Sequence, residues 1–510
     1  MLKVLSQNKY LILIISIGLA LRLYGIGHGF PYIYNVDEPA LVRSASQIRF
    51  DINPKHFDWP HMHFYLNYLL FTAFSAARSV IQMAGLKSSL IASFPLLWRD
   101  PLIFYYLARA FNAFLGTGTI LVMYFIGSKL MGRKAGVVSA LAMALFPYHV
   151  WASHFALIDV PMTFWFSLSV LFSINIYKEG RWKDYILAGL FAGFSASTKY
   201  NGGFAVLIIF LAYLLRIQSE NVLSFDFAKV LSNKNTKAIL VAAVFSVIGF
   251  FAGTPFALFD YKTFSITDSP KGAYWQFTNV GKVNAGEYFE QLLQVLTTRF
   301  ADEFGVTYLV IFELYILFVA IAKREKSRLL VLIPGIFYFL YVTSFDKNRI
   351  HYYMLTFPFI ALMVADVFVY LEELLIIRFS HKKYMIALVC SAIFFAPLVI
   401  SLQKAFFISQ PDTRNIVSEW VRANVPAGAT IYYSGGDLEA VVADLNFKTK
   451  KAGSLSNLNI MSGSYVLVST NQTILENQAL KNLSLKSDVV FLNEPFGSRP
   501  GPNIYVLAIK

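Results

Sequence analysis

The chain has 510 residues, of which 56% are hydrophobic and 15% are charged, and it contains 48 Phe and 29 Tyr. Soluble domains have about a quarter of their residues charged, so this composition excludes a fold surrounded only by water, and it also excludes a disordered or collagen-like chain. The formal net charge of +14 would suit a nucleic-acid partner, but no clustered basic stripe or zinc-ligand spacing supports one. We therefore predict an integral membrane protein that does not bind nucleic acid.

Eleven apolar runs are predicted to span the membrane, since about 20 residues of helix cross some 30 Å of hydrocarbon. They cover approximately residues 10–27, 102–131, 135–151, 160–177, 185–198, 203–216, 238–257, 306–322, 329–344, 352–371 and 384–402. A further apolar run, 64–84, is expected to be a juxtamembrane or re-entrant helix within a long first outer loop, 28–101. Arg78 in this run favours that placement, because an arginine at the bilayer centre is costly.

Basic residues are distributed unevenly between the two sides of this topology. If 64–84 does not cross the membrane, the N-terminus, with Lys3 and Lys9, lies on the same side as four basic connections. These connections are 133–134, 178–183, 323–328 and 378–383. The opposite short connections carry few positive charges. The positive-inside rule therefore predicts that the N-terminus is cytoplasmic.

The tail after the last predicted span has a different character. Prolines and glycines separate short apolar strands such as Tyr465–Ser469 and Ile504–Ile509. We predict a transmembrane domain over 1–402 and a small extracytoplasmic α/β domain over 403–510. The single cysteine, Cys390, excludes an intrachain disulfide.

Acidic residues mark two places on the predicted outer face. Asp37 and Glu38 follow the first span, and two adjacent acids in a low-dielectric site favour one of them as a base or a ligand. Asp159 lies in a short connection that has no basic residue, where a carboxylate at the lipid boundary must be offset by a partner or a function. Helix capping is the alternative for each, supported by Pro39 and Pro161.

Two cations also fall on this face, each with a tyrosine nearby. Lys199 and Tyr200 interrupt a long apolar run, and Arg349 and Tyr352 stand at the entrance to the 352–371 span. Together they could bind a phosphate at the lipid surface, the arginine through paired hydrogen bonds and the lysine as a point charge. Snorkelling of both side chains to the interface is the alternative.

Three further residues are candidates. His61 and His63 are two residues apart and would point in different directions on a helix, so a metal pair is weakly indicated. Anchoring of this stretch by the aromatic residues Trp59 and Tyr65 is the alternative. Arg109, early in its span, is expected to pair with an outer-face acid, one of Asp37, Glu38 and Asp159.

Cofactor signals are weak. Three carboxylates could hold a divalent metal, but their spacing does not require one, and no cofactor is required. A phosphate-cradling glycine loop, a Walker lysine and a serine-hydrolase elbow do not occur in the sequence. Any activated donor is therefore expected to be carried by a lipid rather than by a nucleotide.

The order of these features resembles the GT-C superfamily of membrane glycosyltransferases, in particular the family 39 protein O-mannosyltransferases and relatives such as the aminoarabinose transferase of lipid A. Its Asp-Glu pair is matched by Asp37-Glu38, and its second-loop aspartate by Asp159. The stretch Trp59–Tyr65 loosely matches a His-Pro-Pro-Leu-Tyr-Tyr-like motif. Lys199-Tyr200 resembles a recurring Lys-Tyr motif, and Arg349 before Tyr352 resembles an Arg-Tyr stretch. His61 replaces the second proline of the usual motif, and His154 stands where an arginine is common.

The resemblance implies an all-α polytopic fold with about 11 transmembrane helices and outer juxtamembrane helices. It implies inverting transfer of a sugar, mannose or a related hexose, from a polyprenyl-phosphate donor to a hydroxyl acceptor on protein, lipid or glycan. Asp37 would be the base, Glu38 a second carboxylate or a metal or acceptor contact, and Asp159 a further acidic site residue. Substrate contacts would come from Lys199, Tyr200, Arg349, His61, His63, Arg109 and Tyr352. Membrane lipid would surround the carrier, and the outer segment 258–305, with Tyr274, Trp275 and Phe277, would cover the site.

Two alternatives from other classes remain open. A transporter or lipid flippase would use the same outer-face charges to recognise its substrate, although such proteins often show internal repeats and place their charges near the bilayer midplane. A non-catalytic receptor would depend on the tail 403–510 and would tolerate the loss of Asp37.

Overall fold

The computed structural model describes residues 9–87, 98–217, 236–321, 326–378, 382–452, 462–472, 476–493 and 499–510. Lys3, Lys323 and Arg324, which contribute to the predicted topology, and part of the 28–101 loop lie outside these residues. The chain divides into two compact units. The first comprises Met1–Leu23 and Asp37–Lys404, and the second comprises Tyr24–Val36 and Ala405–Lys510.

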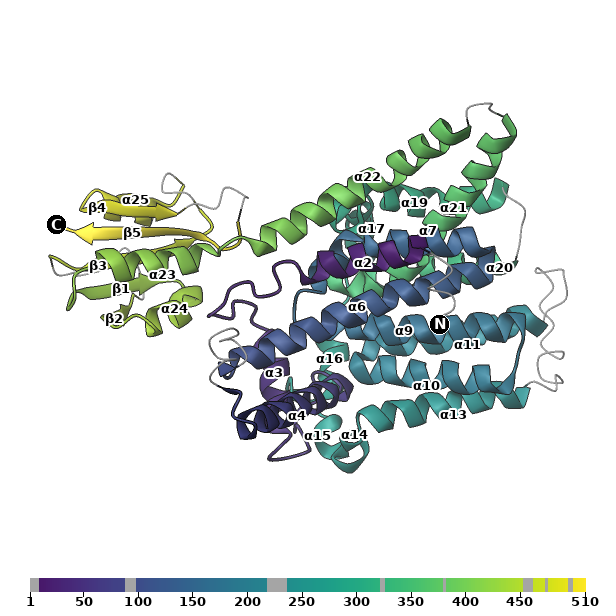
Figure 1. The fold of residues 1–510 in the computed structure, drawn as a ribbon, viewed down its shortest axis with the longest axis horizontal. Helices are drawn as coiled ribbons and strands as arrows, with labels where there is room; N and C mark the ends of the chain where they lie inside the picture. Colours follow the sequence, from purple (N-terminus) through teal and green to yellow (C-terminus); the bar gives the residue numbers. More distant parts are fainter. Residues whose placement is uncertain are drawn as a thin grey trace. The chain divides into compact units, whose positions relative to one another are not determined.

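The first unit is built from helices (Figure 1). Its N-terminal half contains α2 (Lys9–Leu23), α3 (Glu38–Gln47), α4 (Met62–Met83), α6 (Leu102–Met131), α7 (Arg133–Ala144), α8 (Pro147–Ala152), α9 (Asp159–Lys178), α10 (Trp182–Thr198), η2 (Tyr200–Phe204) and α11 (Ala205–Ile217). Its C-terminal half contains α13 (Thr236–Gly253), α14 (Phe256–Phe259), α15 (Tyr261–Phe264), α16 (Ala273–Asn279), α17 (Ala285–Thr297), α18 (Ala301–Phe304), α19 (Val306–Ile321), α20 (Lys326–Thr343), η3 (Ile350–Thr356), α21 (Phe357–Arg378) and most of α22 (Lys382–Ser409). The end of α22, from Ala405, belongs to the second unit.

Several of these elements are long and apolar enough to cross a membrane. Within the described ranges six stretches qualify, namely Leu102–Met131, Asp159–Lys178, Tyr200–Ile217, Thr236–Gly253, Ile350–Leu375 and Tyr384–Asn424. Val306–Val319 and Ser327–Thr343 are shorter apolar helices, and α4 is not among the six. The predicted all-α polytopic class is confirmed, while the number of eleven spans stays a prediction.

Small residues set the packing of the central helices. In Figure 1, α6, α9, α10 and α13 run alongside one another, and α10 and α13 share the most extensive contact. Gly193 on α10 lies against the backbone of Ser246 and Gly249 on α13, so closely that a side chain there would collide with it. Such close approach is how membrane helices gain packing energy where lipid offers no hydrophobic driving force. The packed helix α10 ends at Thr198, and Lys199 adopts an extended conformation between α10 and η2.

The second unit contains a mixed five-stranded sheet in the order β2-β1-β3-β5-β4. Its strands are β1 (Thr430–Ser434), β2 (Lys448–Lys451), β3 (Tyr465–Thr470), β4 (Ser487–Asn493) and β5 (Asn503–Ile509), and its helices are α23 (Thr413–Asn424), η4 (Gly436–Leu438), α24 (Glu439–Ala443) and α25 (Gln478–Ser484). β1 pairs in parallel with β2 and β3, whereas β5 is antiparallel to β3 and β4. The predicted small α/β domain and two of its predicted strands are therefore confirmed.

A segment far away in the sequence completes this unit. Tyr32 donates a hydrogen bond to the Asp444 carboxylate at 2.9 Å. The Asn415 amide donates to the carbonyl oxygens of Gly29 and Phe30 at 3.2 and 2.9 Å. The apolar pattern places residues 24–36 with the first unit, and only these long-range contacts reveal their association with the tail.

Candidate active site

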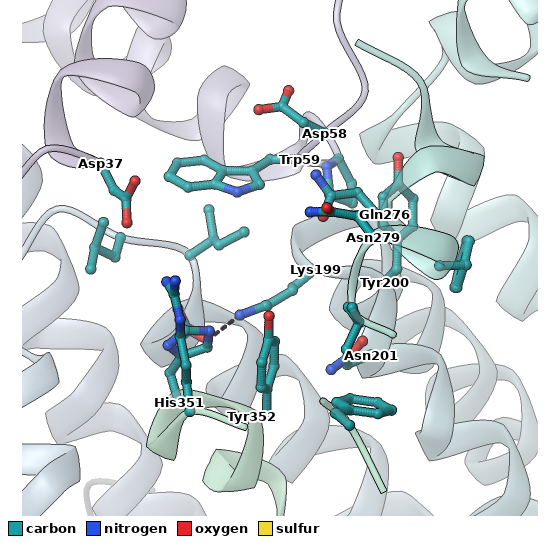
Figure 2. A pocket seen from close by; sticks show the side chains of 18 of the residues that line it. Asp37, Asp58, Trp59, Lys199, Tyr200, Asn201, Gln276, Asn279, His351 and Tyr352 are labelled. Atoms are coloured by element: carbon teal, nitrogen blue, oxygen red, sulfur yellow. Dashed lines mark hydrogen bonds and ion pairs between the residues drawn. The ribbon is translucent and has the colours of Figure 1, made fainter. Parts of the chain in front are cut away.

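A pocket of about 390 Å³ lies within the first unit, a size within the range of about 300–1,000 Å³ typical of small-molecule sites. The polar side chains and tryptophans that line it come from six separate segments, and they include Asp37, Asp58, Trp59, Asp159, Lys199, Tyr200, Asn201, Trp275, Gln276, Asn279, Lys282, Arg349, His351 and Tyr352 (Figure 2). Six predicted site residues are among them, namely Asp37, Asp159, Lys199, Tyr200, Arg349 and Tyr352. The other four, Glu38, Arg109, His61 and His63, do not line this pocket.

Asp37 enters the pocket from the start of α3. It occupies the N-cap position, yet its side chain makes no capping hydrogen bond to the helix, and the following turn contains Pro39. The proline has no N–H group for a cap to satisfy. The Asp37 carboxylate points into the pocket (Figure 2).

Asp159 and Lys199 form an ion pair in the pocket wall. Lys199 Nζ lies 2.6 Å from Asp159 Oδ1, as the dashed line in Figure 2 marks. Asp159 is the first residue of α9, and Lys199 adopts an extended conformation that ends α10. The side chains are 12% and 17% exposed, and Lys199 Nζ lies 5.4 Å from the centre of the Tyr352 ring. Both charges are thus largely desolvated but still reach the cavity.

Arg349 brings a second cation to the same cavity. It has an extended backbone just before η3 and is solvent-exposed. Lys282, which follows α16, also lines the pocket. The pocket therefore combines carboxylates with several cations, an arrangement suited to an anionic ligand that also carries hydroxyl groups.

Glu38 forms a different kind of ion pair. Both of its carboxylate oxygens accept hydrogen bonds from Arg109 at 2.7 Å, and Oε1 also accepts from the Ala156 N–H at 2.8 Å. The Glu38 and Arg109 side chains are 0% and 1% exposed. Asn112, one turn after Arg109, donates to the carbonyl oxygens of Phe155 and Leu157. This buried cluster joins the start of α3 to the connection that leads to Asp159.

The two histidines also lie inside the protein. His61 Nε2 is 2.8 Å from the His56 carbonyl oxygen, and the His61 N–H donates to Thr254 at 3.1 Å. The His63 ring stacks on Phe111, with 5.6 Å between ring centres. Burial lowers the pKa of His61 to about 4 and that of His63 to about 3, so both rings are neutral at physiological pH.

A resident metal does not fit the described residues. Across the described ranges, no group of three His, Cys, Asp or Glu side chains is arranged to hold one. In the pocket, Asp159 is engaged by Lys199 and Asp58 by His56. We therefore derive no step of the reaction through a metal.

Several pocket residues escape the sequence-based prediction. Asp58 and Trp59 belong to the stretch selected for its histidines, and the carboxylate and the indole rather than the imidazoles line the cavity. Gln276 and Asn279 lie on α16, inside the segment expected to cover the site. Trp275 and Phe277 of that segment line the pocket, whereas Tyr274 does not.

This chain is similar to a known protein family and to enzymes of known structure. A family model described as dolichyl-phosphate-mannose-protein mannosyltransferase matches residues 99–263. The oligosaccharyltransferase AglB of Archaeoglobus fulgidus, in complex with an inhibitory peptide and a dolichol-phosphate, is 14% identical over 98% of this chain and 74% of its own, with a TM-score of 0.54. ArnT of Cupriavidus metallidurans, bound to undecaprenyl phosphate, is 12% identical over 97% of both chains, with a TM-score of 0.50. The predicted resemblance to GT-C enzymes is confirmed.

The extent of these similarities differs. Against the apo form of the Archaeoglobus enzyme, 85% of this chain aligns, at 13% identity and a TM-score of 0.50, and it spans 63% of the length of that chain. Among curated proteins, no sequence matches. At such identities, the structural similarity shows that this chain shares the fold of these membrane enzymes.

Proposed function

We propose that the protein is a glycosyltransferase that moves a sugar from a polyprenyl-phosphate donor to a hydroxyl acceptor. The observation that carries this proposal is a pocket that brings together Asp37, the Asp159–Lys199 pair and Arg349. The neighbours bound to dolichol-phosphate and undecaprenyl phosphate support a polyprenyl carrier. The mannosyltransferase family model supports mannose or a related hexose as the transferred sugar.

The transfer is a single displacement at the anomeric carbon. The acceptor oxygen forms a bond to this carbon as the bond from the carbon to the phosphate oxygen breaks, and the electron pair leaves with polyprenyl phosphate. Asp37 accepts the proton of the acceptor hydroxyl, a role that typically contributes about 10² to 10⁴-fold to the rate. The configuration at the anomeric carbon is inverted. Because the phosphate is a weakly basic leaving group, no strong general acid is needed.

The cations stabilise the departing phosphate. Arg349 presents a planar fork that matches two phosphate oxygens, and Lys199 supplies a point charge. Asp159 holds the Lys199 ammonium at 2.6 Å and so reduces the reorganisation needed when charge develops on the leaving group. The Tyr352 ring, 5.4 Å from the Lys199 ammonium, stabilises it through a cation–π contact.

An apolar pocket could receive the isoprenoid chain. A cavity of about 150 Å³ lies between α11 and α20. It is lined by apolar side chains, namely Phe204, Leu207, Ile208, Leu211, Ile333, Pro334 and Phe337. On η2, Tyr200 lines the polar pocket and Phe204 lines this cavity. On α20, Tyr341 lines the polar pocket and Phe337, one turn before it, lines this cavity. The polar headgroup and the hydrocarbon tail of one donor would thus occupy adjoining cavities.

The remaining predicted site residues support the fold of the pocket. Glu38 and Arg109 fix the start of α3, and with it Asp37. His61 and His63 pack as neutral rings behind the wall that contains Trp59. On the distribution of basic residues, we assign the pocket and the C-terminal unit to the extracytoplasmic side and the N-terminus to the cytoplasm.

A transfer assay tests this proposal. Purified protein in lipid nanodiscs is given polyprenyl-phosphate mannose or related hexoses, and released polyprenyl phosphate is measured by mass spectrometry. We expect turnover by the wild type and a loss of at least about 10²-fold in Asp37→Asn. Asp302→Asn, an exposed acid of α18 outside the pocket, is the matched control and should be fully active. Normal turnover by folded Asp37→Asn would rule out the assigned base.

The acceptor requires a separate experiment. Glycans and glycoproteins from cells with and without the gene can be compared by mass spectrometry. Loss of a specific hexose from protein, lipid or glycan would identify the acceptor class. Accumulation of an untransferred substrate on one side of the membrane, with every glycan unchanged, would instead favour a transporter.

A further inference from the structure

A chain of three side chains leads from α3 to the pocket. The Ser44 hydroxyl lies 3.0 Å from His56 Nε2, and His56 Nδ1 makes a hydrogen bond to Asp58 Oδ1. Ser44 lies in the middle of α3, the helix that begins directly after Asp37. The helix that presents the proposed base therefore also holds, through His56, a second pocket carboxylate.

The backbone around Asp58 is fixed at several points. The Tyr200 hydroxyl donates to the Phe57 carbonyl oxygen at 2.7 Å. The Phe57 N–H donates to the Lys271 carbonyl oxygen at 2.5 Å, and the His56 carbonyl oxygen lies 2.8 Å from His61 Nε2. The Phe57 ring is fully buried. Asp58 thus projects from a rigid segment, as a group preorganised for a ligand does.

The order serine–histidine–aspartate matches that of an acyl-transfer triad, but the surroundings do not. Ser44 is only 9% exposed, and it lies within a helix whose N–H groups are already engaged in i to i−4 hydrogen bonds. No oxyanion could then find two donors beside the Ser44 hydroxyl. The network instead orients Asp58, the member of the three that lines the pocket.

The surroundings of Asp58 differ from the phosphate-binding end of the pocket. In Figure 2, Asp58 and Trp59 lie toward Gln276 and Asn279, whereas His351 and Tyr352 lie at the opposite end with Lys199 between them. A carboxylate and two amides can accept and donate hydrogen bonds to hydroxyl groups, and an indole offers a flat apolar face. This combination suits a sugar ring, which presents hydroxyl groups at its edge and C–H groups on its face.

We propose that Asp58, held by Ser44 and His56, binds hydroxyl groups of a pyranose that carries no acidic group and whose ring packs on Trp59. The proposal rests on the proposed glycosyltransferase function and specifies its sugar. His56 already engages one oxygen of Asp58, and the Asn279 side-chain oxygen accepts a hydrogen bond from Lys347 at 2.7 Å. Both side chains are therefore oriented before the ligand arrives. An acidic sugar would be repelled by Asp58, so the wall selects against a ring that carries an acidic group.

Deoxy analogues test this assignment by a cycle of substrate and enzyme changes. Wild type, Asp58→Asn and His56→Gln are assayed in nanodiscs with parent polyprenyl-phosphate hexose and with donors that each lack one ring hydroxyl. The wild type should lose at least tenfold in kcat/KM on one deoxy donor. Asp58→Asn should show a similar loss of kcat/KM already with the parent donor, and the deoxy donor should cause no further loss in this variant. His56→Gln should lose part of its kcat/KM with the parent donor and should be less sensitive than the wild type to the deoxy change. Asp51→Asn, an exposed acid of the same loop, is the control and should keep the wild-type ratio.

The same assays distinguish a donor sugar from an acceptor sugar, and they distinguish failure of this proposal from failure of the proposed function. If the sugar belongs to the acceptor, the same pattern appears with deoxy acceptor glycosides instead of deoxy donors. Wild-type ratios in Asp58→Asn and His56→Gln on every analogue, or a preference of the wild type for an acidic sugar, would overturn the proposal. Absence of wild-type turnover with every polyprenyl-phosphate sugar would instead contradict the proposed function. In that case, binding affinities test the role of Asp58. The wild type should bind polyprenyl-phosphate hexose at least tenfold more tightly than bare polyprenyl phosphate, and Asp58→Asn should not show this preference.

Discussion

Two acid–cation pairs in the first unit have similar chemistry and opposite surroundings. Glu38–Arg109 is sealed, with side chains 0% and 1% exposed and a further hydrogen bond from the Ala156 backbone. Asp159–Lys199 is 12% and 17% exposed and lines the pocket. Only the second pair can meet a ligand without opening the protein. Burial, rather than charge or proximity in sequence to Asp37, separates the pair that supports the fold from the pair that serves the site.

The largest expected effect lies in the sealed pair. Glu38→Gln leaves Arg109 as a buried charge without its carboxylate, and breaking a buried pair in this way costs about 3–5 kcal/mol. Denaturant unfolding of the purified variant measures the loss. A change below about 1 kcal/mol would show that Glu38 does not support the fold and would return it to the candidates for catalysis.

A pH effect sharpens the distinction between buried and open groups. Burial lowers the pKa of His61 from 6.5 to about 4, so the unfolded chain binds a proton at a pH where the folded protein does not. Stability from this group is therefore complete above about pH 6.5 and is lost as the pH falls toward 4, at a rate of at most about 1.4 kcal/mol per pH unit. His61→Gln should show a weaker decline of the melting temperature over this range. An identical decline in both proteins would contradict the buried neutral ring.

The open side of the comparison is tested at Arg349. Arg349→Gln removes charge-assisted hydrogen bonds to the carrier phosphate, which are worth about 1.5–3 kcal/mol, so kcat/KM should fall by about 10 to 100-fold with stability unchanged. Arg349→Lys should recover part of the activity because it restores the charge but not the fork. Equal activity of the wild type and Arg349→Gln would remove this residue from the phosphate site.

A smaller effect is expected in the apolar cavity. Leu207→Trp, in the wall of the α11–α20 pocket, should raise KM for a long-chain donor by about tenfold or less, because it fills space meant for isoprene units. A short-chain donor that does not reach this cavity should be unaffected, and it is the internal control. The same rise for both donors would show that the hydrocarbon chain lies elsewhere.

The sequence predicts part of this site for clear physical reasons. Apolar runs and the polar residues that interrupt them identify Asp37, Asp159, Lys199 and Arg349, because a charge at the edge of a span needs a partner or a function. Asp37 and Glu38 are neighbours in sequence, yet one faces the cavity and the other the protein interior. The direction of each carboxylate is set by tertiary contacts, which a linear pattern does not contain.

Other parts of the site depend on contacts that are distant in sequence. Asp58 becomes a pocket residue because Tyr200 and Lys271 fix the backbone of Phe57. The residues next to Asp58 in sequence do not predict either contact, because Tyr200 and Lys271 are distant in the chain. The association of residues 24–36 with the tail likewise depends on Asn415 and Asp444, whose partners are 386 and 412 positions away in the chain.

The most direct test exchanges the cations of the two pairs for an uncharged side chain of similar length. Lys199→Met and Arg109→Met are compared for transfer of a polyprenyl-phosphate hexose per folded molecule and for unfolding free energy. The account predicts that Lys199→Met stays folded and loses about 10² to 10³-fold in turnover, whereas Arg109→Met is destabilised but its folded fraction still turns over. A Lys199→Met variant that is fully active, together with a folded Arg109→Met that is inactive, would contradict it.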